Sequence, residues 1–352
     1  MFEKYKPRII STNIKTRRLG YIIALIDLIG NNFLFLDDVL RRLEFWAKKK
    51  QKELERYFGR TGLITESPKH YPARRYIHLA ENLRLVKISR NECALTKIGQ
   101  PLLYLAKSPQ NPFHLTDEQV CYLLKRILEN DFDYFLPLLK LLKKFNKTKE
   151  IFLNFKKAVL NHLEIKSEKI KDILKSSDIK ERKNQILRWT QEKKYLEHII
   201  YPRLDWMIDL RILNAHKYRR RIYEFTEEGA NFLKEMERME VKDLDKWLEE
   251  HFYKIFGRSF IKGKKIPFIM LNNRERFKYI SNFLEDSFRK FSSPSLPLQH
   301  MSANTFLEYT CTKLVVMGIL PSFDQLKDTL KQMPGYRLQW QPAMQDGFII
   351  KI

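Results

Sequence analysis

The chain has 352 residues, with 66 Lys and Arg against 42 Asp and Glu, which gives a formal net charge of +24. Hydrophobic residues make up 44% and aromatic residues 13%, so buried cores can form, and only 11 Gly and 14 Pro exclude a low-complexity chain. A positive excess of this size attracts polyanions. Nucleic acid is the first candidate for such a polyanion, and an acidic membrane is the second. Alternatively, the charge reflects a source whose proteins are generally basic and has no bearing on function.

Cys93, Cys121 and Cys311 are an odd number of cysteines with wide spacing. Such a set is typical of reduced thiols and excludes a disulfide framework or a zinc cluster. The most apolar window, residues 21–29, contains Asp27 and has about half the length that a membrane span needs. With no visible N-terminal signal, we expect a soluble cytoplasmic protein without a membrane partner.

The first hundred residues predict helices at 18–29 and 36–50, from apolar residues at helical spacing. Residues 51–70 are polar and predict a long loop or an extra helix. Next comes a third predicted helix at 71–83. It is followed by a β-hairpin at 85–95 with a polar turn at residues 89–92. The order is therefore helix, helix, helix, hairpin, helix.

A linker at residues 108–112 contains two prolines. Thr116 then provides an N-cap for a helix that runs to about residue 129. Further helices are predicted at 132–145, 150–163, 168–174 and 180–196. A helix follows at 243–256.

The most informative pattern is a repeat that relates residues 71–103 to residues 201–233. Thr96 and Thr226 lie 130 residues apart, as do Gly99 and Gly229. The apolar tetrads before them, residues 83–86 and 210–213, lie 127 apart, so the second hairpin is three residues longer. Differences confined to a turn are typical of homologous units.

Each threonine stands where a strand ends and a helix begins, so its hydroxyl can cap free backbone N–H groups. Glycine in a helix costs roughly 0.5–1 kcal/mol against alanine. The recurrence of Gly99 and Gly229 therefore predicts that each helix start packs closely against its hairpin.

The pattern shared by the two copies resembles the winged-helix superfamily. It consists of the tetrad Leu-x-(Leu/Ile)-(Val/Leu), a turn, and then (Leu/Phe)-Thr-x-x-Gly-x-x-(Leu/Phe)-Leu. The resemblance implies a mainly α fold with tandem winged-helix units, each a three-helix core plus a β-hairpin wing. It also implies that the third helix enters the major groove of DNA and that the wing contacts phosphates or the minor groove. More loosely, tandem units on a basic chain resemble DNA-recognition subunits of bacterial restriction and anti-phage defence systems.

The last third of the chain predicts a mixed α/β region, with helices at 274–291, 304–317 and 323–331 and a terminal hairpin of residues 336–340 against 347–352. Its end is compatible with a third, truncated winged-helix unit. The expected organisation is unit 1 at 1–110, a helical block with unit 2 at 111–240, and the mixed α/β region at 241–352.

The second hairpin carries the sharpest candidates for DNA contact, because four cations crowd one turn and repel one another unless phosphates neutralise them. In the first unit, cations stand at the start of the third helix and on the wing. The third helix of the second unit and a basic stretch at 140–194 add further candidates. The candidate DNA-binding residues are Lys69, Arg74, Arg75, Lys87, Arg90, Lys143, Lys144, Arg203, Lys217, Arg219, Arg220 and Arg221.

An enzymatic alternative exists. Asp133 with Glu164 and Lys166 has the residue types of a restriction-nuclease centre, in which two carboxylates hold Mg²⁺ and a lysine steadies the attacking water. That centre needs adjacent strands, whereas these residues lie in helical patterns. No nucleotide-binding, serine-hydrolase or zinc-enzyme motif is present, so neither a catalytic residue nor a metal or cofactor is assigned.

We therefore expect a non-catalytic subunit that binds double-stranded DNA, beside partner proteins that carry ATPase or nuclease activity in a prokaryotic defence complex. A magnesium-dependent nuclease, a replication initiator, a transcription regulator, a protein-docking scaffold and an RNA-binding protein remain alternatives.

Replacing Arg219, Arg220 and Arg221 together with alanine should weaken DNA binding and flatten its salt dependence without unfolding the protein. Three or four phosphates at this hairpin correspond to a slope of about −3 in log K against log salt. Titrations at several salt concentrations measure it, and unchanged binding by the triple variant removes this hairpin from the interface.

Overall fold

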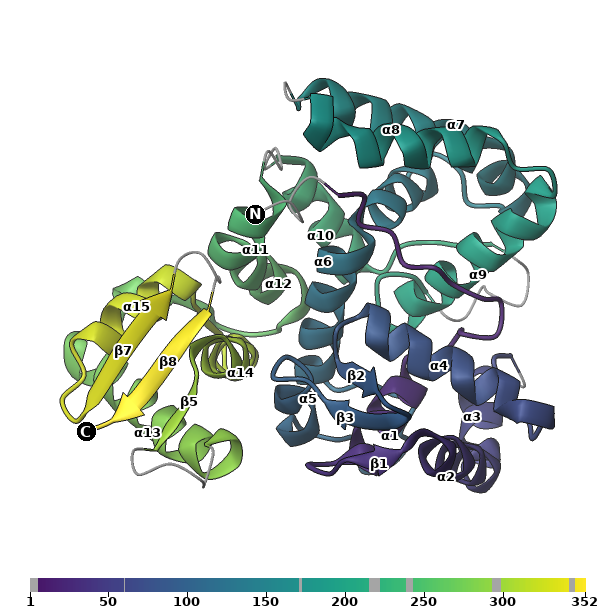
Figure 1. The fold of residues 1–352 in the computed structure, drawn as a ribbon. Coiled ribbons are helices and arrows are strands. Elements are labelled where there is room, and N and C mark those ends of the chain that lie inside the picture. The colour runs from purple at the N-terminus through teal and green to yellow at the C-terminus, as the bar shows by residue number, and fades with distance from the viewer. Residues whose placement is uncertain are drawn as a thin grey trace.

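The computed structural model describes residues 6–59, 61–170, 173–214, 222–238, 243–292, 299–341 and 346–352. The chain is mainly α-helical, with 63% helix, small antiparallel sheets and a mixed α/β C-terminal region. In Figure 1 the long helix α6 runs through the middle of the molecule. The N-terminal elements lie below it, α7 and α8 lie at the top, and the C-terminal sheet lies to the left.

The N-terminal unit has the predicted order of elements. The polar stretch after its second helix forms an extra helix rather than a loop. The elements are α1 (Gly20–Ile29), β1 (Leu34–Phe35), α2 (Leu36–Lys49), α3 (Gln51–Phe58), α4 (Tyr71–Asn82), β2 (Val86–Ser89), β3 (Glu92–Leu95) and α5 (Gln100–Tyr104). The strands form an antiparallel sheet in the order β1-β3-β2.

The predicted hairpin is confirmed, with Val86 opposite Leu95 and Ser89 opposite Glu92. Its two turn residues, Arg90 and Asn91, both have positive φ, at 50° and 65°. Two such residues make the tight turn whose twist matches that of antiparallel strands.

The helical block consists of α6 (Asp117–Leu142), α7 (Thr148–Glu168), α8 (Ile173–Leu187) and α9 (Glu192–Asp209). Thr116 caps α6, as predicted, and the structure shows that it does so in a capping box with Gln119. The two helices predicted at 116–129 and 132–145 are one helix, in which only Asp131 leaves helical φ and ψ and Pro137 is accommodated. The helix bounds predicted between residues 163 and 196 were also wrong. Helix α7 continues to Glu168, α8 spans Ile173–Leu187, and α9 begins only at Glu192.

The second copy of the repeat runs from the end of α9 into α10 (Glu227–Arg238). Leu213 and Phe225 pair in an antiparallel bridge. The backbone N–H of Asn214 donates to the carbonyl of Glu224 at 2.8 Å. The two segments that flank the second turn therefore run antiparallel, as the repeat predicted.

The two copies share one hydrogen-bond pattern. The Thr96 hydroxyl donates to the carbonyl of Arg84 at 2.5 Å and accepts from the backbone N–H of Gly99 at 2.9 Å. In the second copy the Thr226 hydroxyl donates to the carbonyl of Arg211 at 2.6 Å and its oxygen accepts from a glycine N–H, also at 2.9 Å. This confirms the register that was read from the sequence.

The preceding helix ends in the same way in each copy. Arg84 and Arg211 take the left-handed conformation, with φ of 60° and 59°. The next residue then donates its N–H back to the helix, from Leu85 to Ala80 and from Ile212 to Met207. Such an ending satisfies the last carbonyl groups of a helix and turns the chain sharply into the first strand.

The repeated glycines are explained by close backbone contact. A Cβ atom on Gly99 would overlap the carbonyl oxygen of Leu85, and one on Gly229 would overlap that of Ile212. The predicted tight packing of each helix start on its hairpin is therefore confirmed.

The C-terminal region contains two helices where one was predicted at 243–256, because the chain leaves helical geometry at His251. Its elements are α11 (Leu244–Glu250), α12 (Phe252–Phe260), β4 (Ile266–Pro267), η4 (Phe268–Met270), α13 (Asn273–Phe291), β5 (His300–Ser302), α14 (Ala303–Val316), β6 (Ile319–Leu320), α15 (Phe323–Lys331), β7 (Tyr336–Gln341) and β8 (Asp346–Lys351). The terminal sheet has the order β5-β8-β7, the same connectivity as β1-β3-β2.

Helix α6 joins the parts of the molecule, because most of its side chains are buried. Lys125 and Arg126 on α6 both bind the buried carboxylate of Glu308 on α14, at 2.5 and 2.6 Å. Although burial opposes ionisation, these two cations hold the pKa of Glu308 below its ordinary value.

Within the described ranges, none of the helices combines the length and the apolar character that crossing a bilayer requires.

Replacing Gly99 with alanine should lower the free energy of unfolding by about 3 kcal/mol, since the added methyl group collides with backbone. Gly59 provides the contrast, because nothing lies within 4 Å of an added Cβ there and the cost of alanine comes from its positive φ of +66°, whereas Gly99 has a helical φ of −76°. Gly59→Ala should cost about 1 kcal/mol. Chemical denaturation compares the variants, and equal losses would contradict the close contact.

Candidate nucleic-acid interface

The start of α4 presents the predicted cations of the N-terminal unit. Lys69 is exposed and lies just before the helix, where Lys69 and His70 both have positive φ, at 58° and 52°. Such backbone is unfavourable for residues other than glycine, at about 1 kcal/mol each, so the surrounding structure must impose it. Arg74 and Arg75 follow on the first turns of the helix, opposite its buried residues Tyr76 and Ile77.

These arginines keep access to solvent. Arg74 approaches Asp37 of α2 at 3.8 Å, and both side chains are about half exposed. The Arg75 guanidinium donates to the Tyr71 hydroxyl at 2.9 Å and lies over its ring at 4.6 Å from the centroid. Exposed pairs of this kind are weak, so both arginines stay available to an anion.

His70 has a structural role instead. Its Nδ1 lies 2.7 Å from a carboxylate oxygen of Glu44, which is almost buried on α2. This contact joins the start of α4 to α2.

The hairpin adds Lys87 and Arg90, both of which are exposed. Arg90 lies at the tip, where its positive φ belongs to the turn. The structure therefore brings five candidates, Lys69, Arg74, Arg75, Lys87 and Arg90, onto one unit, on the helix and hairpin that precede α5.

Arg203 was wrongly predicted as a DNA contact, because its side chain is fully buried on α9. Its guanidinium binds both carboxylate oxygens of Asp131 at 2.6 Å. It also donates to the carbonyls of Ile199 and Ile10 and to the Thr12 hydroxyl. With its donors used inside the protein, Arg203 holds α9 to α6. Burial nevertheless keeps the pKa of Asp131 above its ordinary value.

The burial of Arg203 has a cause that was missed at the sequence level. Residues 6–19, here called the N-terminal strap, cross α6 and α9 before α1 begins (Figure 1). Asp131 accepts from the backbone N–H of Ile10 at 2.8 Å, and Asp133 accepts from that of Arg8 at 2.7 Å. No pattern within the strap itself indicates these distant partners.

The same strap explains two acidic residues of α9. Arg17 pairs with Asp205, and Arg18 donates to Asp209 at 2.7 Å. Burial raises the pKa of Asp209 to about 6, although Arg18 and the backbone N–H of Leu19 favour its ionised form. The C-terminal half of α9 is therefore covered on every side and cannot lie in a groove of DNA.

Lys143 and Lys144 are exposed at the end of α6. Lys143 forms a 2.7 Å ion pair with Glu237 of α10, and because the lysine side chain is exposed this pair is weak as well. Several other cations of the basic stretch are paired as well, such as Lys156 with Glu192 at 2.7 Å. The candidates Lys217, Arg219, Arg220 and Arg221 lie outside the described residues.

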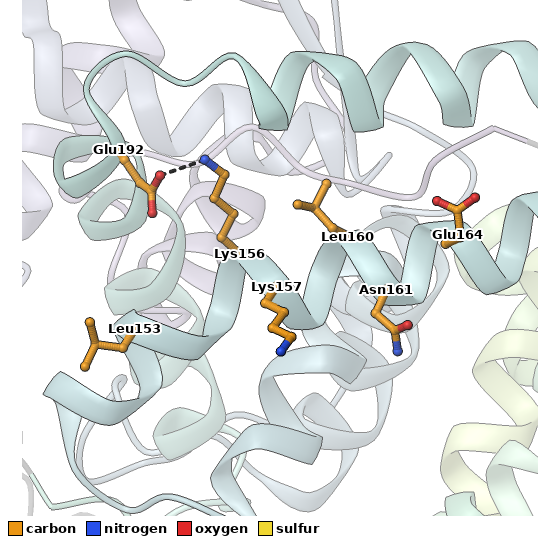
Figure 2. Close-up of a pocket in the computed structure, with 7 residues that line it drawn as sticks. All are labelled: Leu153, Lys156, Lys157, Leu160, Asn161, Glu164 and Glu192. Atoms are coloured by element: carbon orange, nitrogen blue, oxygen red, sulfur yellow. Dashed lines mark hydrogen bonds and ion pairs between the residues drawn. The ribbon is translucent and has the colours of Figure 1, made fainter.

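The residues of the nuclease alternative are not brought together. Asp133 is buried and binds Lys166 at 2.5 Å and His162 at 2.9 Å, and these contacts lower its pKa although burial opposes ionisation. Glu164 points elsewhere on α7, where it pairs with Lys183 and borders an open hollow lined also by Lys156 and Glu192 (Figure 2). Among the residues with described positions, no group of three metal-binding side chains occurs.

Comparison of the chain with protein-family models, with curated proteins and with solved structures finds no match. Inferences about function therefore rest on the geometry of this chain.

Replacing Arg203 with methionine should lower the free energy of unfolding by about 3–5 kcal/mol, because Asp131 would remain buried without its counter-charge. Lys144→Met is the matched control on an exposed position and should change stability by less than about 0.5 kcal/mol. Denaturant titration measures both. A fully stable Arg203→Met variant with weakened DNA binding would reinstate Arg203 as a contact.

Proposed function

We propose that the chain binds duplex DNA through its N-terminal unit, which acts as a winged-helix domain. In this proposal α4 is the recognition helix and the β2–β3 hairpin is the wing. The observation that carries the proposal is a set of cations in contact with solvent on or just before these two elements, of which Lys69, Lys87 and Arg90 are exposed and Arg74 and Arg75 half-exposed. Helices in the major groove and wings on the phosphate backbone use such cations.

We also propose that the chain contains three related units. The Thr96 and Thr226 hydrogen bonds support kinship between the first two, because a backbone arrangement is repeated atom for atom. The matching strand orders β1-β3-β2 and β5-β8-β7 support kinship of the third.

The three units differ in the charge that their corresponding helices present. In α15 the cation Lys327 is drawn toward Asp324 and Glu249, each at 3.6 Å, and it lies over Trp340. In α9 the C-terminal half is buried beneath the strap. These differences support the N-terminal unit as the principal DNA contact.

We further propose that the chain is a binding subunit, and that partner proteins supply ATPase or nuclease activity in a prokaryotic defence complex. The resemblance of tandem winged-helix units to such recognition subunits is the basis for this part. A transcription regulator or replication initiator would instead bind one defined site as the purified chain alone. Affinity purification, followed by binding assays with and without the co-purifying proteins, distinguishes a subunit of a complex from a regulator or initiator that acts alone.

Replacing Arg74, Lys87 and Arg90 together with alanine should weaken duplex binding by about 10- to 100-fold. The slope of log K against log salt should become less negative by about 2–3, because three phosphate contacts are lost. Fluorescence anisotropy at several salt concentrations measures both quantities.

The matched control removes the same charge from α13, by replacing Arg274, Lys278 and Arg289 with alanine. These side chains are exposed in the C-terminal unit, at the far side of the molecule from α4 (Figure 1). The control should bind nearly as the unaltered chain does. An equal loss in both variants would indicate attraction by net charge only, and no loss in either would refute the proposed interface.

A further inference from the structure

The N-terminal strap passes between α4 and α9, and one pair of side chains on each helix lies beside it. Tyr71 and Arg75 lie one turn apart on α4, and Lys194 and His198 lie one turn apart on α9. Neighbouring strap residues contact both helices. The Asn13 side-chain amide donates to the Tyr71 hydroxyl at 3.3 Å, and the next backbone N–H donates to Nδ1 of His198 at 3.3 Å.

Every group left free in this set is a hydrogen-bond donor. The Tyr71 oxygen already accepts from Asn13 and from Arg75, and within the described residues its hydroxyl hydrogen has no acceptor. Because Nδ1 of His198 accepts from the strap, the neutral ring carries its hydrogen on Nε2. That Nε2 also has no partner among the described residues. Lys194 is exposed, with three ammonium donors.

The electrostatic environment is positive. Partial burial lowers the pKa of His198 below its ordinary value, and the nearby charges of Lys194 and Arg75 lower it further, while Glu197 opposes them. His198 therefore stays neutral at ordinary pH and offers an N–H donor beside two permanent cations. Two cations against one carboxylate leave an excess of positive charge, and a site with several donors and such an excess is suited to an oxyanion.

We propose that Tyr71, Arg75, Lys194 and His198 form a binding site for a backbone phosphate of duplex DNA. The inference rests on the proposed function, since the duplex that α4 contacts is the one whose backbone would cross the strap to α9. The N-terminal half of α9 thus contributes to binding, although its C-terminal half is buried. The strap joins the two helices at this place, through Asn13 to Tyr71 on α4 and through Ile14 to His198 on α9.

The two α9 residues contribute in different ways, and this difference tests the proposal. Lys194→Ala removes a cation, so it should weaken duplex binding by about tenfold and make the salt slope less negative by about 0.9. His198→Asn keeps an oxygen that can accept from Ile14 but loses the Nε2 donor. At pH 8 it should weaken binding by about fivefold and leave the salt slope unchanged, because a neutral donor releases no counterion.

Lys193→Ala is the matched control. Lys193 is exposed and adjacent to Lys194 but points from a different side of α9, and it should lose little affinity. Circular dichroism melts of each variant check folding, and the exposed position of Lys194 makes its variant informative even if His198→Asn is unstable.

The outcomes separate this inference from the proposed function. If the chain binds duplex DNA through Arg74, Lys87 and Arg90, and Lys194→Ala and His198→Asn both bind as Lys193→Ala does, the phosphate site is refuted and the proposed function stands. If the unaltered chain shows no salt-dependent affinity for duplex DNA, the phosphate site and the proposed function are both refuted. A preference for duplex RNA at the same residues would also overturn the assignment to DNA.

Discussion

The rest of the structure depends on four buried carboxylates, Asp131 and Asp133 on α6 and Asp205 and Asp209 on α9. Burying a carboxylate without a counter-charge is far costlier than any single packing contact. Their partners come from α7, from α9 itself and from the strap, which supplies arginine side chains and backbone N–H groups. The strap is therefore held between α6, α9 and α4, and with it the relative placement of the N-terminal unit and the helical block. The placement of α4 beside α9, on which the proposed phosphate site depends, follows from the contacts that neutralise these charges.

The repeated units show how one backbone arrangement can be put to different uses. Thr96 and Thr226 make the same hydrogen bonds, and Gly99 and Gly229 are needed for the same backbone contact. These interactions are local and do not depend on what surrounds the unit. What surrounds each unit differs: α4 keeps its cations in solvent, whereas the second half of α9 lies under the strap. Shared ancestry of the fold, if the three units have it, does not imply a shared role in binding.

The sequence was most successful where the interactions lie close along the chain. The N-cap at Thr116, the hairpin at residues 86–95, and α15 and the terminal hairpin were predicted from spacing and turn residues. It failed near Asp131, where a break between two helices was predicted but one helix continues, and where the Asp131 carboxylate binds Ile10 and Arg203 from distant parts of the chain. It also failed at Arg203, because a cation on a helix looks the same whether it faces phosphate or a buried carboxylate 72 residues away.

The sequence by itself determined the net positive charge, the mainly helical content and the repeated Thr and Gly arrangement, since composition and short-range hydrogen bonding are properties of contiguous residues. Only the tertiary structure decided which cations are exposed. Arg75 and Arg203 are both arginines on the helix that precedes a turn of the repeat, yet Arg75 stays partly exposed and Arg203 is buried against Asp131. The physical reason is that burial of a charge depends on a counter-charge brought by folding from another part of the chain, and residue type and spacing do not encode its position.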